Sequence, residues 1–86
     1  MNRGHELPPA HPIDSHVGRR VRELRHERGI DQSTCATAAE ISIERFQLCE
    51  CGSERLRVGE LFRLARFLDV RISAFFHGLD QTLSNP

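Results

Sequence analysis

The stretch that decides the fold is QSTCATAAEISIERFQLC, residues 32–49. Small apolar residues recur at helical spacing in its first half, and larger ones do so in its second half. Asp31 and Ser42 stand just before these halves, and both residue types cap helix N-termini. The stretch therefore predicts two short helices, about 32–39 and 43–51, joined by a tight turn. Their apolar positions are Cys35, Ala36, Ala39, Ile41, Phe46 and Cys49.

A further helix is expected upstream, over about residues 15–28. Asp14 and Ser15 are good N-cap residues for it. Gly29 can end it, because glycine adopts a positive φ at little cost. The apolar face of this helix would consist of Val17, Val21 and Leu24.

Two more helices are expected downstream. Residues 58–68 carry an apolar stripe at helical spacing, and a short fifth helix is expected around Phe75. The proline-rich residues 1–13 and the tail 80–86 offer little that could pack, so both are expected to be disordered. The sequence thus predicts one all-α domain of five helices over residues 14–79. None of these helices is long enough to be stable alone, so packing must hold them together.

Composition limits the classes of protein that this chain can be. Its 86 residues, 38% of them hydrophobic, suffice for one small core. Twelve basic residues, all arginine, balance twelve acidic ones, so the chain as a whole offers no strong field for nucleic acid. No segment has the pattern of a signal peptide or a membrane span. With an odd number of cysteines inside helical patterns, a cytoplasmic protein with free thiols is expected.

The order of these elements resembles a known family, the lambda-repressor-like (Cro/XRE-type) helix-turn-helix transcriptional regulators. Residues 32–49 are similar to its helix-turn-helix. VGRRVRELRHERGIDQ (17–32) is similar to its first helix, and ECG (50–52) to the Glu-x-Gly that follows its third. LFRLARFLDVRISAFF (61–76) resembles its fourth and fifth helices. The resemblance runs over residues 17–79 and implies a compact five-helix domain that binds double-stranded DNA and regulates transcription, most simply as a repressor.

The resemblance also implies which residues would meet DNA, with the third helix in the major groove. The base-reading residues would be Ser42, Ile43, Glu44, Gln47 and Leu48. Apolar side chains can contact thymine methyl groups, and a glutamate can accept a hydrogen bond from cytosine. The phosphate contacts would come from Gln32, the backbone around Gly52, and Arg55. Arg25 and Glu50 would form an ion pair between the first and third helices; two solvated surface charges are the alternative.

The sequence departs from the family pattern on this surface. Glu40 stands where glycine usually forms the turn, and a positive φ at another residue costs about 1 kcal/mol. Between residues 40 and 54, four glutamates face only Arg45, a net charge of minus three. Since neutralised phosphates supply non-specific affinity, this surface should bind DNA weakly. The alternative function is a divergent, antitoxin-like domain that has lost DNA affinity and uses the same helix for protein interaction or dimerisation.

No cofactor, metal site or catalytic site is expected. Zinc sites normally need four ligands in close pairs, and no histidine has suitable spacing to the cysteines. Cys35 and Cys49 occupy core positions, whereas Cys51 is expected to be exposed. The histidines lack the nucleophile or paired carboxylates that catalysis needs, so an enzyme is not expected. No binding site for a small-molecule ligand is evident.

The phenylalanines give this small domain a large apolar area. Phe67 lies off the main stripe of its helix and, with Phe76 or Leu79, is expected to form a self-association patch. A core larger than the one outlined above is the alternative. The resemblance implies a homodimer, because such domains commonly bind two half-sites as dimers.

Overall fold

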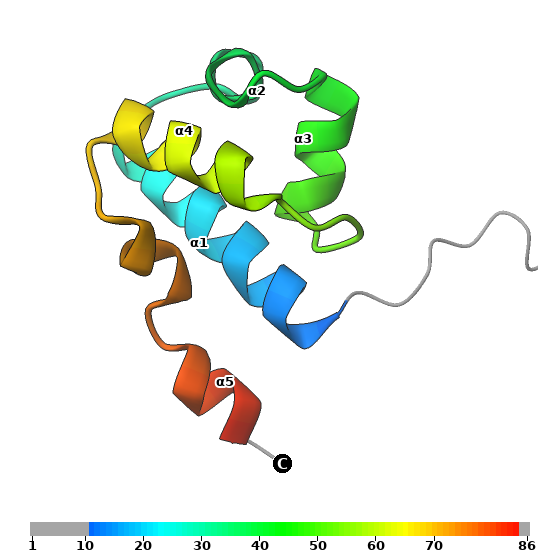
Figure 1. Cartoon of the computed structure of the whole chain (residues 1–86), viewed down its shortest axis with the longest axis vertical. Helices are drawn as coiled ribbons and strands as arrows, with labels where there is room; N and C mark the ends of the chain where they lie inside the picture. The colour runs from blue at the N-terminus through cyan, green and yellow to red at the C-terminus, as the bar shows by residue number, and fades with distance from the viewer. Residues whose placement is uncertain (1–10, 85–86) are drawn as a thin grey trace, which may run out of the picture.

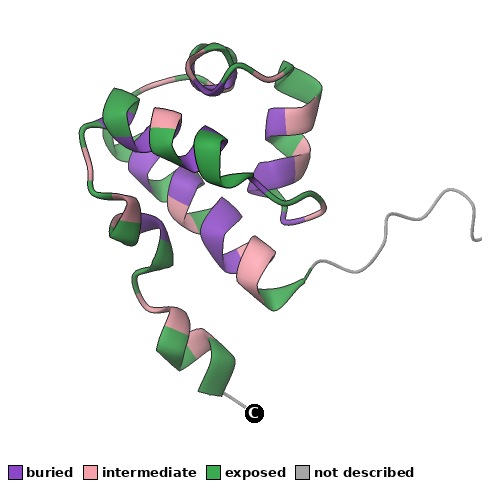
Figure 2. Ribbon diagram, viewed as in Figure 1, coloured by how far each residue is buried: buried purple, intermediate pink, exposed green. Residues whose placement is uncertain are grey.

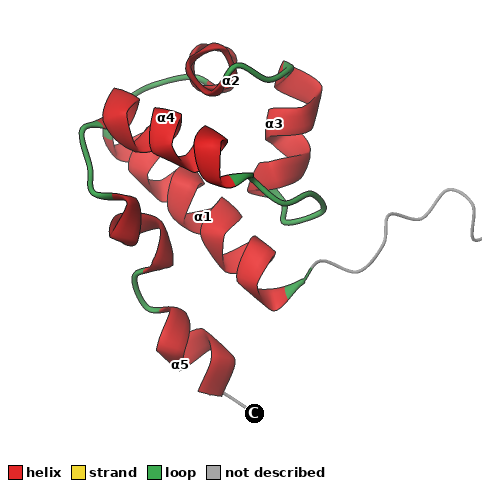
Figure 3. Cartoon of the chain, viewed as in Figure 1, coloured by secondary structure: helices red, strands yellow, loops and turns green. Residues whose placement is uncertain are grey.

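The computed structural model describes residues 11–84, and within them the chain is helical with short connections and no strand (Figures 1 and 3). The expected all-α architecture is confirmed. The expectation of disorder at residues 1–10 and 85–86 lies outside the described residues. The elements are α1 (Pro12–Glu27), α2 (Gln32–Ala39), α3 (Ile43–Glu50), α4 (Val58–Leu68), the 3-10 helix η1 (Ile72–Phe76) and α5 (Leu79–Ser84).

The long helix α1 is the scaffold of the domain. It packs against α3, η1 and α5, while α2 packs against α3 and α4. Figure 2 shows the buried residues on the inner faces of α1, α3 and α4, where they meet in one core. None of the helices within residues 11–84 is long and apolar enough to cross a membrane. The core consists of Val17, Val21, Leu24, Cys35, Ala36, Ala39, Phe46, Cys49, Leu56, Leu61, Leu64, Ala65, Leu68 and Phe75.

The turn between α2 and α3 forms with glutamate at the position where glycine was the usual residue. Glu40 adopts a left-handed conformation with φ 63°, and its N–H donates to the carbonyls of the last turn of α2. The next residue, Ile41, donates its N–H to Ala36 O at 3.0 Å and closes the turn. Asp31 Oδ1 accepts from Thr34 N at 2.7 Å, and this hydrogen bond lowers the pKa of Asp31. Both predicted caps form, since Ser42 Oγ also accepts from the α3 backbone.

α1 and α3 touch through their backbones at Gly18. This glycine is buried, and a Cβ added to it would lie 2.7 Å from the carbonyl oxygen of Glu50 and closer still to that of Cys49. Any side chain here would push the C-terminal end of α3 away from α1. The sequence gives no sign of this contact, because a glycine inside a helical pattern is compatible with many other roles.

α1 begins earlier than expected. Its first residue is Pro12, and the cap is His11, whose Nδ1 accepts from Ile13 N at 3.2 Å. Neither Asp14 nor Ser15 caps the helix. The physical reason is that proline is favoured in the first turn, where its missing N–H has no intrahelical acceptor. Asp14 lies instead in the first turn and pairs with a residue of the α3–α4 loop.

The ordered chain also extends beyond the expected end at residue 79, because Leu79–Ser84 forms α5 where a tail was expected. The buried His16 of α1 fixes this segment. Its Nε2 donates to His77 O at 2.6 Å, and its Nδ1 lies 2.9 Å from Thr82 Oγ1. The fifth expected helix, around Phe75, is a 3-10 helix. Phe75 is fully buried, so the expected core contact is present in a tighter helix.

Candidate nucleic-acid interface

The residues expected to read bases lie together on the outer side of α3. Ser42, Ile43, Glu44 and Gln47 are exposed, and Leu48 is half-buried. The positions i, i+1, i+4 and i+5 share one face of a helix, and the opposite face carries the buried Phe46 and Cys49. The structure thus presents one continuous face of mixed apolar, amide and carboxylate chemistry.

The buried ion pair joins α1 to the end of α3. Arg25 Nε donates to Glu50 Oε2 at 2.7 Å, and Nη2 donates to Oε1 at 3.2 Å. A third donor, Nη1, reaches Ile30 O at 2.9 Å. The side chains of both ion-pair residues are less than a tenth exposed. Of the two alternatives, the paired arrangement is the one present, and its two-point geometry fixes the direction of α3.

Gln32 lies at the junction of α2 and α3 and bonds inward. Its Nε2 donates to Glu50 Oε1 at 2.8 Å, and its Oε1 accepts from Gln47 Nε2 at 3.1 Å. The amides of Gln32 and Gln47 therefore align the two helices with each other. Each amide has capacity left over, since an NH₂ group has two donors and a carbonyl oxygen two lone pairs.

The other expected phosphate contacts differ in accessibility. Gly52 is buried with φ 84°, and its N–H donates to Cys49 O at 3.0 Å. The N–H groups of Ser53 and Glu54 donate to Leu48 O. Few backbone N–H groups of this loop therefore remain free to bind a phosphate. Arg55 is different. Its Nε donates to Asp14 at 3.0 Å, but 70% of its side chain is exposed.

Most of the acidic charge near α3 is compensated. Arg45 pairs with Glu54 at 3.1 Å and with Glu60 at 2.7 Å, and Glu40 lies 3.8 Å from an arginine of α4. Burial would raise the pKa of Glu60, but hydrogen bonds from Arg45 and from the N–H of Arg57 outweigh it, so this pKa lies below its ordinary value. Among residues 11–84, no basic side chain pairs with Glu44.

Arg22 of α1 is a basic residue that sequence reasoning missed. It is exposed, and with Gln32, Gln47 and Cys51 it lines a hollow of about 260 Å³ between α1, α2 and α3. Arg19 is also exposed, one turn earlier on the same helix. The helical pattern shows that Arg22 faces solvent, but only the packing of α1 against α3 places it beside the reading face.

The three thiols have different environments. Cys35 and Cys49 are buried, and burial raises the pKa of each to about 11. Cys51 is exposed, with its Sγ donating to Gln47 O at 3.1 Å. The described residues contain no cluster of three potential metal ligands.

We expect only Cys51 to react with Ellman's reagent in the native protein, because thiolate access decides reactivity. Absorbance at 412 nm should report one equivalent within minutes and three after denaturation. The Cys51→Ser variant should release none in the native state. Rapid release of two or three equivalents from the native protein would contradict the buried positions.

Comparison with known proteins identifies the family of this chain. The chain is 37% identical over 71 residues to a transcriptional regulator in the ATPase CF(0) region of Rhodospirillum rubrum, covering 83% of this chain and 66% of that protein. It is 32% identical over 69 residues to a helix-turn-helix regulator of Rickettsia conorii, covering 80% of this chain and 55% of that one. The chain therefore spans only about half to two thirds of these curated relatives. No protein-family model matches it.

A solved structure agrees with these relatives in fold and in sequence. The restriction-modification controller protein C.AhdI from Aeromonas hydrophila superposes with a TM-score of 0.72 at 26% identity, over 77% of this chain and all of that one. These relatives and this neighbour are regulators, not enzymes. By sequence and by fold, this chain belongs to the lambda-repressor-like, Cro/XRE-type helix-turn-helix family of transcriptional regulators.

Proposed function

We propose that this chain binds double-stranded DNA in a sequence-specific manner, with α3 in the major groove, and represses transcription by occupying its site. The observation that carries the proposal is the exposed face of α3, held in a fixed direction by the Arg25–Glu50 pair. An α-helix fits the major groove of B-DNA, where base edges present a distinct pattern for each base pair. A rigid helix is needed, because readout depends on placing side chains within hydrogen-bond distance of those edges.

Each exposed side chain on this face has a matching base chemistry. Ile43 and Leu48 can contact thymine methyl groups, and Glu44 can accept from the N4 amine of cytosine. Gln47 keeps one amide hydrogen and lone pairs for a base while its other amide hydrogen is bonded to Gln32. Ser42 uses its hydroxyl as a cap and would approach DNA at the end of the helix.

The phosphate contacts would flank this face. Gln32 and the exposed Arg55 stay candidates, and the structure supports adding Arg22, which lies beside Gln32 and Gln47. Gly52 would act mainly by allowing the loop to pack, since a Cβ there would meet Ser15. Arginine suits such contacts because its planar guanidinium binds phosphate oxygens in pairs. Because no basic side chain of residues 11–84 pairs with Glu44, non-specific affinity should be low, and the part that the arginines supply should fall as the salt concentration rises.

The test is selection of bound duplexes from a random pool, followed by the same selection with Glu44→Gln. This change keeps the shape and removes the charge. We expect the variant to lose preference at one base pair by about tenfold or more, the value of one good base contact. The control is Glu54→Gln, because Glu54 pairs with Arg45 outside the reading face and should leave the preference unchanged.

The alternative function gives a different result in the same experiment. Glu44 has no basic partner within residues 11–84 and lies beside Ile43, which is 37% exposed, so this face would also suit a contact with another protein. Absence of binding even at low salt would favour this protein-interaction role. A uniform gain of affinity in Glu44→Gln, without a change of base preference, would indicate relieved repulsion and no base reading by this residue.

We also propose that the chain forms a homodimer through its exposed aromatic residues. Phe67 and Phe76 are both exposed, as expected, and Leu79 is half-buried. The structure adds Phe62 and Val58, exposed one turn apart on α4. Sedimentation equilibrium should show a dimer at micromolar concentration. Phe67→Glu should raise the dissociation constant of this dimer at least tenfold. A wild-type protein that stays monomeric at 100 µM would contradict the proposal.

A further inference from the structure

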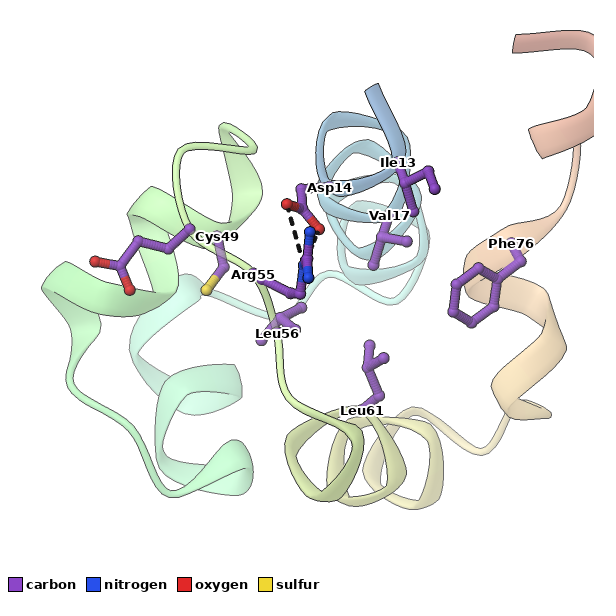
Figure 4. Close-up of a pocket in the computed structure, with 9 residues that line it drawn as sticks. Ile13, Asp14, Val17, Cys49, Arg55, Leu56, Leu61 and Phe76 are labelled. Carbon is purple, nitrogen blue, oxygen red and sulfur yellow. Dashed lines mark hydrogen bonds and ion pairs between the residues drawn. The ribbon is translucent and has the colours of Figure 1, made fainter. Parts of the chain in front are cut away.

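A small cavity lies behind α3, between the first turns of α1, the α3–α4 loop, the start of α4 and η1 (Figure 4). Its volume is about 130 Å³. In Figure 4, Val17 and Leu61 extend toward each other across the space between α1 and α4, and Phe76 lies at its side. Cys49 of α3 and Leu56 of the loop face it from the other side. The remaining lining residues are Ile13, Asp14, Glu54 and Arg55.

The walls of this cavity are apolar, and its charges are confined to paired groups. Arg55 Nε bonds Asp14 at 3.0 Å, and Glu54 is held by Arg45 at 3.1 Å. Arg55, the one basic side chain of residues 11–84 that lines the cavity, is therefore already paired and is not free to balance an anion inside. The thiol of Cys49 stays protonated, since burial raises its pKa to about 11. An occupant therefore needs to fill apolar space without bringing a charge or unsatisfied polar groups.

The size of the cavity defines the occupant further. Apolar cavities of about 150 Å³ inside proteins stay dry and bind benzene. The cavity here is slightly smaller and opens at its rim, where Phe76 is 37% exposed. We propose that this cavity is a binding site for a small uncharged apolar molecule, of the size and class of a single aromatic ring. This site is separate from the reading face of α3, because its lining residue on α3, Cys49, lies on the buried side of that helix; Arg55 is the one lining residue that the proposed phosphate contacts share.

Binding can be tested on the full chain with benzene and fluorobenzene as probes. Titration followed by ¹H–¹⁵N correlation spectra should give saturable shifts that are largest at Val17, Leu61 and Phe76. A dissociation constant of roughly 1 mM or below is expected for a ligand of six heavy atoms. The ¹⁹F signal of fluorobenzene should shift in parallel.

Two variants test whether benzene binds in the cavity or elsewhere on the protein. Leu61→Phe puts a larger side chain into the space and should weaken benzene binding at least tenfold. Arg66→Gln changes an exposed residue of the same helix that does not line the cavity, and it should leave the affinity unchanged. If Leu61→Phe does not fold, Val17→Ile, which adds one methyl group at the same wall, should weaken binding at least threefold.

Three outcomes would overturn the proposal. The first is that the shifts do not saturate, or that they spread over the surface. The second is tighter binding of benzoate than of benzene, since that would require an uncompensated cationic group. The third is a set of nuclear Overhauser contacts in the free protein between Val17 or Leu61 and residues that do not line the cavity, which would mean that the chain itself fills it.

Discussion

Replacing Gly18 with alanine is expected to lower the free energy of unfolding by about 3 kcal/mol, at the upper end of what overpacking costs. The effect is large because the added Cβ meets backbone atoms, 2.7 Å from Glu50 O and closer to Cys49 O, and these cannot rotate away as a side chain can. For a domain of this size, the loss corresponds to a fall of about 12–24 °C in Tm. Thermal unfolding followed by circular dichroism at 222 nm measures it.

Helix propensity alone predicts the opposite change in the free energy of unfolding. Alanine is favoured over glycine inside a helix by about 1 kcal/mol, so a helix without the contact would be stabilised. Gly59 in α4 supplies the matched control, because a Cβ there would approach only the end of the Arg63 side chain, at 3.5 Å, which is an ordinary van der Waals contact. Gly59→Ala should leave stability unchanged or raise it by up to about 1 kcal/mol. Equal effects of the two substitutions would show that α1 and α3 do not touch at Gly18.

Local chemistry was readable from the sequence where one residue decides the conformation of its own segment. Asp31 and Ser42 form the expected caps, because capping depends only on a side chain and the backbone that follows it. Glu40 takes the positive φ that the turn demands. The family resemblance went further and paired Arg25 with Glu50, a contact between distant segments that spacing alone does not reveal.

Other features depend on which surfaces meet, and the sequence does not specify this. The role of Gly18 comes from the carbonyls of α3, and the role of Arg22 from the neighbouring amide of Gln47. Nothing in the sequence distinguishes His16 from the other four histidines, yet its two ring nitrogens hold the chain on either side of Gly78. α5 was missed for the same reason, since a helix of six residues is stable only where it docks.

Replacing Glu50 with alanine is expected to cost about 3–5 kcal/mol, the usual effect of breaking a buried ion pair by removing one partner. Arg25 would keep its charge while losing two of its three hydrogen bonds, with only the one to Ile30 O remaining. Gln32 would lose its acceptor as well. Urea unfolding at pH 7, with the midpoint and the slope fitted separately, measures the loss.

The loss of stability in Glu50→Ala should come from the buried, unpaired charge of Arg25. It should not come from the loss of an especially strong hydrogen bond. A double variant, Arg25→Met with Glu50→Leu, removes both charges and fills a similar volume, so it should recover most of the stability. In this double variant, α3 would still lack the two hydrogen bonds between residues 25 and 50 that fix its direction. If α3 reads DNA, this stable double variant should therefore bind its site at least tenfold more weakly than the wild type. Recovery of stability together with full affinity would show that the pair has no part in orienting α3.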